Sequence, residues 1–250
     1  MTHMPHPLSV AAEDCLKGIY LLSEATGQAS VGALAERLGV TPASVSAMIR
    51  RLAERHEDED EDDAQAEGES DEEVIDGPYV ILTPYRGVAL TEQGRLVAVD
   101  LLRRHRLLEL FLTRELDVPV DRAHIEAECL EHDLSEDLEE RIFAKLGYPT
   151  RGVHGQPIPR HDGTIPIFPD MPLSELAPGT PAIIAAVPPH EPDLLQYLQK
   201  IGATLGARII SEGSVPYSDS LLVRIEDTQH PLGMAIARRI LVQIAETETT

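Results

Sequence analysis

The residues best suited to chemistry lie in one short stretch of the chain, HIEAECLEH over residues 124–132. If this stretch is helical, His124, Glu128, Glu131 and His132 occupy positions i, i+4, i+7 and i+8 and project from one face. Imidazole and carboxylate groups that share a helical face are typical ligands of a divalent metal ion. The spacing alone also fits a solvated helix surface, or a half-buried histidine that is satisfied by a carboxylate.

Two other predicted helices carry groups that could complete such a site. His105 and Glu109 are four residues apart on a long helix, and Asp14 lies on the first helix of the chain. Packing of three helices together could bring these groups into one coordination shell. Cys129 is rotated by about 100° from Glu128 around its helix. We therefore expect Cys129 to be a packing residue and not a ligand.

The elements that must position these residues begin with a helix-turn-helix. Helices are predicted over residues 9–25, 31–38 and 42–55. Ser30 is suited to cap the second helix, Gly39 to end it, and Thr41-Pro42 to open the third. A short helix, a tight turn with glycine, and a helix with Ser and Arg on its outward face form the helix-turn-helix pattern.

A hairpin and further helices follow. Residues 79–91 contain two β-rich runs separated by a Pro/Gly turn, which would turn the helix-turn-helix into a winged helix. Thr91 caps a long amphipathic helix, and two shorter helices are predicted over residues 122–130 and 135–146. The predicted N-terminal part is thus mostly α.

The amino-acid composition changes after residue 146. Pro and Gly are frequent up to residue 172, which is typical of a linker. Residues 173–246 contain short β-rich runs separated by turns, with one helix predicted over 193–201. We expect a small β-rich, SH3-like C-terminal domain.

Charge is distributed very unevenly along the 250 residues. The formal net charge of −22 argues at first sight against a nucleic-acid partner. However, residues 57–77 carry 13 acidic and no basic side chains, and residues 78–110 carry five Arg against three acids. The acidic segment has little apolar content and is expected to be a solvated, disordered insertion. It is either a tolerated flexible loop or a device that lowers non-specific affinity for DNA.

Several classes of protein are excluded by what the sequence lacks. The two cysteines form no disulfide framework, no apolar run is long enough for a membrane helix, and the polar start of the sequence leads us to expect no signal peptide. We expect a cytoplasmic protein without a membrane partner. No HExxH, GxxxxGK[ST] or GxSxG motif is present, so an enzyme with a small-molecule substrate is not expected.

Six segments, in this order, give the chain a specific resemblance: DCLKGIY, LAERLGVTPASVSAMIRRL, YRGVALTEQG, RRHRLLELFL, ECLEHDLS and HGQPIP. They resemble the diphtheria-toxin-repressor family of metal-dependent transcription regulators, especially its manganese-transport-regulator branch. The resemblance implies a winged helix-turn-helix DNA-binding domain over residues 1–92 and a helical metal-binding and dimerisation domain over 93–150. A linker over 151–172 and an SH3-like domain over 173–250 complete this division.

The resemblance also implies two metal sites. The first would consist of Asp14, Glu128, Glu131 and His132. The second would consist of His105, Glu109 and His124, with Glu191 or His190 of the C-terminal domain as a further candidate.

The ligand types favour a particular metal. Iron-sensing members have thioether and thiol residues at the positions of Asp14 and Glu128, whereas hard carboxylate oxygens suit Mn²⁺. We therefore expect Mn²⁺, with Fe²⁺ as the alternative, and other divalent transition metals are expected to bind in vitro. Lys17 stands where the manganese branch has a carboxylate ligand. The first site is thus either incomplete or completed by water or by the other cluster.

The third helix is expected to read DNA. Its outward residues would be Thr41, Ala43, Ser44, Ser46, Ala47 and Arg50, with Arg51 and the hairpin-tip Arg86 as further phosphate partners. Small hydroxyl side chains suit phosphate contacts and thymine methyl groups. Some iron-type members have Gln at the position of Ala47, so the operator sequence does not follow from theirs.

The predicted function is a manganese-responsive transcriptional regulator. Metal binding would orient the winged helices of a homodimer for a palindromic double-stranded operator. The alternatives are an iron-responsive regulator of the same family, a winged-helix regulator that senses a small ligand, and a metal store without catalytic activity.

Overall fold

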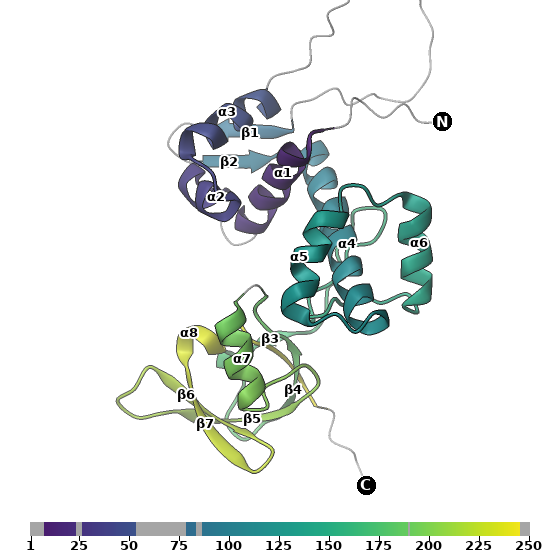
Figure 1. Ribbon diagram of the computed structural model, residues 1–250. Coiled ribbons are helices and arrows are strands. Elements are labelled where there is room, and N and C mark those ends of the chain that lie inside the picture. Colours follow the sequence, from purple (N-terminus) through teal and green to yellow (C-terminus); the bar gives the residue numbers. More distant parts are fainter. Residues whose placement is uncertain (1–7, 24–26, 54–78, 84–86, 190, 246–250) are drawn as a thin grey trace, which may run out of the picture. The chain divides into compact units, whose positions relative to one another are not determined.

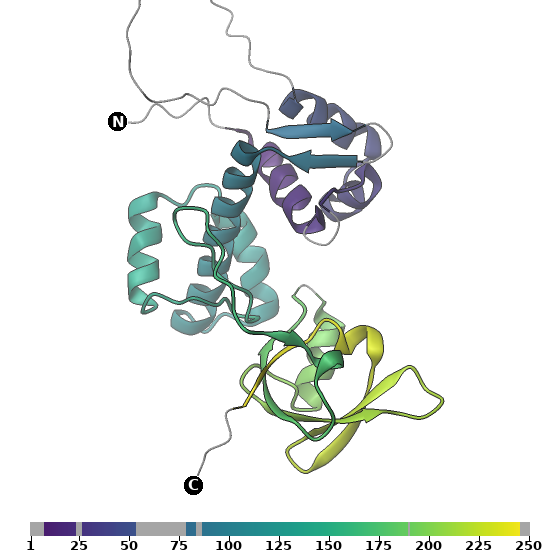
Figure 2. The same ribbon diagram turned by 180° about the vertical axis from the view of Figure 1, so that it is seen from behind.

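The computed structural model describes residues 8–23, 27–53, 79–83, 87–189 and 191–245 (Figure 1, Figure 2). The chain forms two compact units, Met1–Arg103 and Arg104–Thr250. The acidic segment 57–77 lies outside the described residues. Among the residues that are described, no helix is long and apolar enough to cross a membrane.

The first unit has the predicted winged helix-turn-helix. Its elements are α1 (Val10–Ser23), α2 (Val31–Leu38), α3 (Pro42–Ala53), β1 (Val80–Thr83), β2 (Gly87–Leu90) and the start of α4 (Glu92–Glu115). Apolar side chains from all of them form one buried core, which includes Leu16, Ile19, Leu34, Val45, Ile49, Val80, Val88 and Ala98. Burial of these side chains fixes the packing of the three helices on the hairpin.

The helix-turn-helix is formed by the capping residues that the sequence indicates. The Ser30 hydroxyl accepts a hydrogen bond from the Ala33 amide. Gly39 ends α2 in the left-handed conformation with φ 65°, which a glycine adopts without a Cβ penalty. Thr41 precedes α3, and its hydroxyl accepts from the Ser44 amide at 3.2 Å. The turn between the two helices is therefore locally determined.

The hairpin is joined to the segment before α2. β1 and β2 pair antiparallel, from Val80 opposite Leu90 to Thr83 opposite Gly87. Val88 also exchanges two backbone hydrogen bonds with Ala29, at 2.8 and 2.9 Å. The wing is thereby connected to the helix-turn-helix by backbone contacts as well as by side-chain packing.

The second unit begins with a helical part. The end of α4 packs with α5 (Val120–Leu130) and α6 (Glu136–Lys145) around a core that includes Leu107, Leu110, Ala123, Ala127 and Ile142. Ile158 is also part of this core and only 2% exposed, with Val153 packed against it. The Pro/Gly-rich segment expected to be a linker is thus packed over at least part of its length, because it carries apolar side chains between its prolines.

The C-terminal β domain, which we define as residues 171–245, is a single antiparallel sheet with two helices. The strand order is β3-β8-β4-β5-β6-β7. The strands are β3 (Met171–Pro172), β4 (Pro181–Ala186), β5 (Arg208–Ser214), β6 (Ser220–Ile225), β7 (Thr228–Gly233) and β8 (Leu241–Ile244). A 3-10 turn, η1 (Leu173–Glu175), follows β3, and the helices are α7 (Pro192–Lys200) and α8 (Met234–Ala237). This arrangement confirms the expected fold class.

Candidate metal centre

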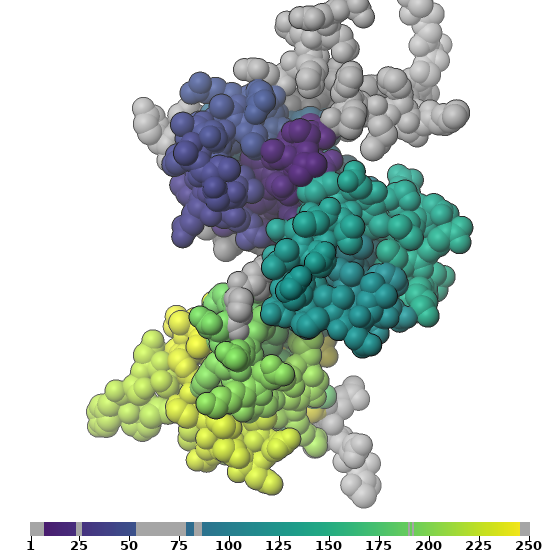
Figure 3. Space-filling model, viewed as in Figure 1, coloured from purple at the N-terminus to yellow at the C-terminus, as the bar shows by residue number. Residues whose placement is uncertain are grey.

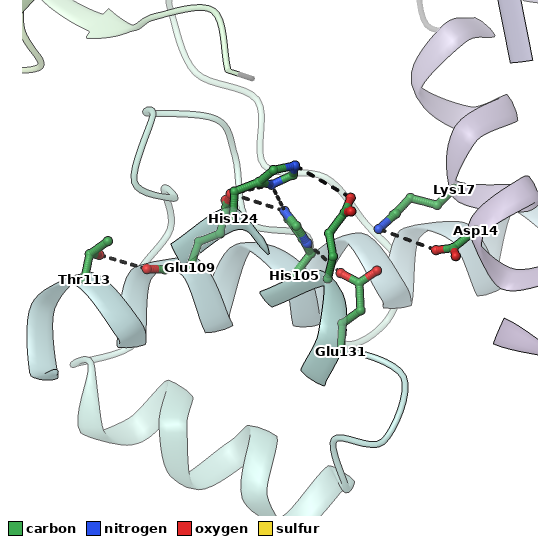
Figure 4. Close-up of polar contacts among 8 residues, drawn as sticks. Asp14, Lys17, His105, Glu109, Thr113, His124 and Glu131 are labelled. Atoms are coloured by element: carbon green, nitrogen blue, oxygen red, sulfur yellow. Dashed lines mark hydrogen bonds and ion pairs between the residues drawn. The ribbon is translucent and has the colours of Figure 1, made fainter. Parts of the chain in front are cut away.

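His105 lies at the centre of a buried polar cluster in the second unit (Figure 4). α4 places His105 and Glu109 one turn apart, and they are only 4% and 3% exposed. His105 Nδ1 lies 2.5 Å from Glu131 Oε2, and His105 Nε2 lies 3.2 Å from Glu109 Oε1. One imidazole therefore contacts a carboxylate through each of its nitrogens.

His124 connects this pair to α5. His124 Nδ1 lies 3.1 Å from both His105 Nε2 and Glu109 Oε1. On its other side, His124 Nε2 lies 3.7 Å from Glu128 Oε1. One ligand atom each from His105, His124 and Glu128 fall within 4.8 Å of one another, which is compatible with one metal ion. We call His105, Glu109, His124, Glu128 and Glu131 the His105 cluster.

The charges in this cluster are set by mutual hydrogen bonding. Burial by itself would lower the pKa of His105, but hydrogen bonds to Glu109 and Glu131 outweigh it and raise the pKa to about 9. Burial would raise the pKa of Glu109, yet hydrogen bonds from His105 and His124 hold that pKa far below its usual range. A protonated His105 therefore stands between the ionised Glu109 and the Glu131 carboxyl group.

His154 is a member of this environment that the spacing argument did not single out. Its side chain is 5% exposed, and it interacts electrostatically with Glu109, His105 and His124. Burial lowers the pKa of His154, Glu109 opposes this effect, and the two other histidines add to it. The HGQPIP segment contains this residue, but it lies outside any helical pattern. Only tertiary packing brings it within electrostatic range of Glu109.

Glu131 and His132 lie just beyond the end of α5. The Glu131 amide still donates to the Ala127 carbonyl, and the side chain is fully buried. Its second oxygen, Oε1, lies 3.6 Å from His132 Nε2. Glu131 therefore contacts His105 with one oxygen and His132 with the other. This carboxylate links the two predicted ligand sets.

Asp14 and Lys17 belong to the first unit. Lys17 Nζ lies 3.9 Å from Asp14 Oδ1, and the Lys17 side chain is 7% exposed whereas that of Asp14 is 35% exposed. The membership of Asp14 in a site with Glu128, Glu131 and His132 stays a prediction. The adjacent Cys15 is buried, and burial, followed by the charge of Asp14, raises the pKa of its thiol to about 11.

Three further expectations concern single residues. The expectation that Cys129 is a packing residue is wrong: Cys129 is exposed, because it lies about 200° around α5 from the buried Ala127. The Glu191 carboxylate contacts the Arg239 guanidinium, which lowers the pKa of Glu191. His190 lies outside the described residues. A metal ligand from the C-terminal β domain at these two positions stays a prediction.

The expected DNA-reading residues lie on the outer side of α3. Six of them are exposed: Thr41, Ala43, Ser44, Ala47, Arg50 and Arg51. Ser46 is half-buried and donates its hydroxyl to the Pro42 carbonyl at 2.9 Å. Arg86 lies outside the described residues. Figure 3 shows the surface of the first unit in purple and blue.

The donor set fits a divalent transition metal of intermediate hardness. The ligand atoms offered by the His105 cluster are imidazole nitrogens and carboxylate oxygens, and none is a thiolate or thioether. Such a set suits Mn²⁺ and also accepts Fe²⁺ and Zn²⁺. A ligating histidine has to be neutral, so coordination by His105 would release its proton.

Three family models match the chain. They are the N-terminal DNA binding domain of the iron dependent repressors over residues 7–56, their metal binding and dimerisation domain over 91–160, and the FeoA domain over 171–244. Together they match parts of both units.

Curated relatives are transcriptional regulators. The HTH-type transcriptional regulator MntR of Geobacillus kaustophilus (strain HTA426) is 35% identical over 145 residues, 58% of this chain and 84% of the relative. MntR of Bacillus subtilis (strain 168) is 35% identical over 136 residues, which are 54% of this chain and 80% of the relative.

Solved structures with the same fold include metal-bound repressors. A manganese-dependent transcriptional repressor in complex with manganese has a TM-score of 0.76 and 34% identity, and the match covers 94% of this chain and 100% of that chain. The manganese regulator SloR has a TM-score of 0.72 and 27% identity, with 94% and 98% covered. ScaR with bound Zn²⁺ has a TM-score of 0.71 and 29% identity, with 94% and 99% covered.

Proposed function

Because the chain belongs to the diphtheria toxin repressor family, which includes the manganese transport regulators, we propose that it is a manganese-responsive DNA-binding transcriptional regulator. The observation that carries this proposal is the His105 cluster, which gathers imidazole and carboxylate ligands from α4 and α5 in a chain that also has a winged helix-turn-helix. The sulfur-free donor set favours Mn²⁺, and Fe²⁺ is the alternative inducer.

The chain's own residues prepare two metal sites. We assign the second site to His105, Glu109 and His124, and the buried His154 is a further candidate ligand. The first site would use Asp14, Glu128, Glu131 and His132, as in the family, and Glu128, which also lies 3.7 Å from His124, would then stand between the two sites. A bound divalent cation supplies the positive charge that compensates these carboxylates. In its absence, the protonated His105 compensates Glu109 and Glu131 only in part.

Metal occupancy would control DNA binding through α1. Asp14 lies on this helix of the DNA-binding unit, whereas the other ligands of the first site lie on α5 and just beyond it. Ligation from both sides would fix the angle of each winged helix in a homodimer. The two recognition helices then match half-sites that are a helical turn or a multiple of it apart. Linkage requires operator DNA to tighten metal binding by the same factor.

A gel shift with metal titration tests the proposal. Full-length protein would be combined with its own promoter and with transporter promoters, in the presence of Mn²⁺, Fe²⁺, Zn²⁺ or a chelator. We expect Mn²⁺ to strengthen binding at least about tenfold, which corresponds to a typical allosteric coupling of 1–3 kcal/mol. A response to Fe²⁺ alone would favour the iron-responsive alternative.

Matched variants separate metal sensing from simple charge effects. Asp14→Ala and Glu109→Gln each remove a ligand and should abolish the response to Mn²⁺ while basal binding persists. Glu140→Gln removes an exposed carboxylate of α6 and should respond as the wild type does. If Asp14→Ala and wild type respond equally to Mn²⁺, the coupling scheme is wrong. Metal-independent binding by all of them would favour the small-ligand regulator.

A further inference from the structure

A tight turn carries His154 to the His105 cluster. Within it, the Gly152 amide donates to the Gln156 carbonyl at 2.8 Å, and the Gly155 amide donates to the Gly152 carbonyl at 3.0 Å. The turn is thus closed by its own backbone. The imidazole of His154 is buried and within electrostatic range of Glu109, and Arg106 of α4 donates a hydrogen bond to the Pro157 carbonyl of the same segment. The turn therefore delivers a titratable ring to the part of α4 that carries Arg106 and Glu109.

The same turn rests on the C-terminal β domain at its backbone. The Val187 amide, directly after β4, donates to the His154 carbonyl at 3.0 Å. Gly155 has φ +87°, and a Cβ at this position would lie 2.0 Å from the Ala185 carbonyl oxygen and 2.7 Å from Ala186 Cα. Only glycine fits here, because both obstacles are backbone atoms and cannot move aside.

An arginine braces the other side of this turn. Two guanidinium nitrogens of Arg151 donate hydrogen bonds, one to the Gly155 carbonyl and the other to Asp170 Oδ1, both at 2.8 Å. Gln243 of β8 donates to the same Asp170 oxygen at 2.7 Å. The guanidinium also lies 3.6 Å from the centroid of the Phe168 ring. The conformation of the turn therefore depends on Asp170, directly before the C-terminal β domain, which is held in turn by Gln243 of that domain.

We propose that Gly155 and Arg151 are positioning residues that hold His154 against the His105 cluster, so that metal binding there is coupled to the contact between this turn and β4. The proposal rests on the proposed function for the presence of the metal. A metal bound by the cluster and His154 would restrain the turn. The hydrogen bond from the Val187 amide to the His154 carbonyl would then break less often. Disruption of the contact would loosen His154 and weaken metal binding by the same free energy.

Hydrogen exchange on the full-length chain tests the coupling without any substitution. With saturating Mn²⁺, we expect exchange in the peptide that contains Val187 to slow by about tenfold relative to chelator-treated protein, together with peptides of α4 and α5. Slower exchange in α4 and α5 with no change at Val187 would overturn the coupling but leave the proposed function intact. No Mn²⁺ effect in either region would count against both.

Two glycines of the same turn provide a matched pair of variants. Gly155→Ala should weaken Mn²⁺ binding by about 10- to 100-fold, the range found when groups that orient metal ligands are lost. Gly152→Ala should bind Mn²⁺ as the wild type does, because Gly152 does not have a positive φ. The atom nearest to a Cβ at this position would be Arg106 Cβ at 3.6 Å, an ordinary van der Waals contact. A folded Gly155→Ala protein with wild-type affinity would refute the positioning role.

A milder variant keeps the test decisive if Gly155→Ala does not fold. Arg151→Gln leaves the turn's backbone hydrogen bonds intact but removes the bidentate brace on Gly155 and Asp170. We expect several-fold weaker Mn²⁺ binding in calorimetry and a smaller Mn²⁺ effect at Val187. Unchanged values of both quantities in this variant would contradict the proposal.

Discussion

His105 determines the charge balance in the buried part of the His105 cluster, because its imidazole contacts the carboxylates of both Glu109 and Glu131. Glu109 and Glu131 are almost fully buried, and ionised groups in such positions need a partner. In the metal-free chain the proton on His105 fills this role. A metal that binds the cluster must therefore displace a proton that the folded chain holds tightly.

The raised pKa of His105 predicts a pH-dependent stability of the metal-free protein. The pKa is about 9 when folded and 6.5 in the reference state, so the folded chain binds this proton more tightly. The stabilisation is fully present below pH 6.5 and is lost as the pH rises through about 9. Since one pKa unit corresponds to about 1.4 kcal/mol, the loss is roughly 3 kcal/mol. Urea denaturation at pH 6 and pH 9.5 would measure it.

His105→Gln is the control for this pH dependence. It removes the titrating group, so the drop in unfolding free energy between the two pH values should shrink by most of that amount relative to wild type. Equal drops in both proteins would show that other groups are responsible.

Lys17 predicts a second effect of a single side chain. Its ammonium is buried, and its Nζ lies 3.9 Å from Asp14 Oδ1, so its positive charge partly neutralises this carboxylate. A metal ion at Asp14 would meet this positive charge. Lys17→Gln should therefore bind Mn²⁺ more tightly in calorimetry, whereas Lys200→Gln at an exposed position of α7 should not. Weaker binding by Lys17→Gln would show that the lysine orients Asp14.

Helical spacing predicts some site residues and misses others for a physical reason. His105 and Glu109 share a face of α4, and His124 and Glu128 share a face of α5, so periodicity identifies both pairs. That these pairs contact one another depends on helix packing, which a spacing pattern does not specify. His154 lies in a turn between helix and sheet, where no periodicity exists. Its approach to Glu109 depends on contacts that are distant in sequence.

At the scale of elements, the turn between α2 and α3 depends on a left-handed glycine, and two substitutions test this. Nothing lies within 4 Å of a Cβ built on Gly32 or on Gly39, but only Gly39 has a positive φ. Gly32→Ala should stabilise α2 by about 0.5 kcal/mol, because alanine loses less conformational freedom in a helix. Gly39→Ala should cost about 1–2 kcal/mol. Amide exchange in α2 and α3 would measure both, and equal effects would contradict the argument.

The outer face of α5 predicts the dimer contact. Ile125 is 56% exposed, and the exposed Cys129 lies one turn further along the helix. Val120 and Leu130, at the two ends of α5, and Leu116, just after α4, are further exposed apolar side chains. A short bis-maleimide should therefore crosslink two chains through Cys129, since Cys15 is buried. Ile125→Lys should reduce crosslinking and dimer formation in sedimentation. Efficient crosslinking of Ile125→Lys would place the contact elsewhere.

The helices were predictable because their signals are local. Ser30, Gly39 and Thr41 directly flank the observed ends of α2 and the observed start of α3. The amphipathic pattern of α4 extends over many turns and is therefore easy to identify. β7 was not predicted, because its sequence, TQHPLG, has a proline in the middle and no alternation. The extended conformation of β7 is determined by its antiparallel pairing with β6 and not by its own sequence. α8, a helix of four residues, is too short to show a period.

At the scale of the whole molecule, the net charge of −22 conceals the slight excess of basic over acidic side chains in residues 78–110, which follow the acidic segment. Residues 57–73 contain 12 acidic side chains. Replacement of these residues by a Gly/Ser segment of equal length should strengthen non-specific DNA binding at low salt, and the difference should fade as salt screens the charges. Fluorescence anisotropy with a scrambled duplex would measure it. Equal affinities at low salt would indicate that the segment is merely tolerated.

α4 also limits how such a protein can change by recombination. The boundary between the two units falls inside this helix, between Arg103 and Arg104. A crossover there would require two foreign half-helices to join in register. A crossover after α4 would separate His105 and Glu109 from His124 and Glu131. A crossover before α4 would separate Tyr79 from Gly94, the third residue of this helix, where a Cβ would lie 2.0 Å from the Tyr79 carbonyl oxygen. The winged helix-turn-helix and the metal-binding helices should therefore be inherited together in this family. Hybrids that combine these parts from different relatives should lose the control of DNA binding by metal.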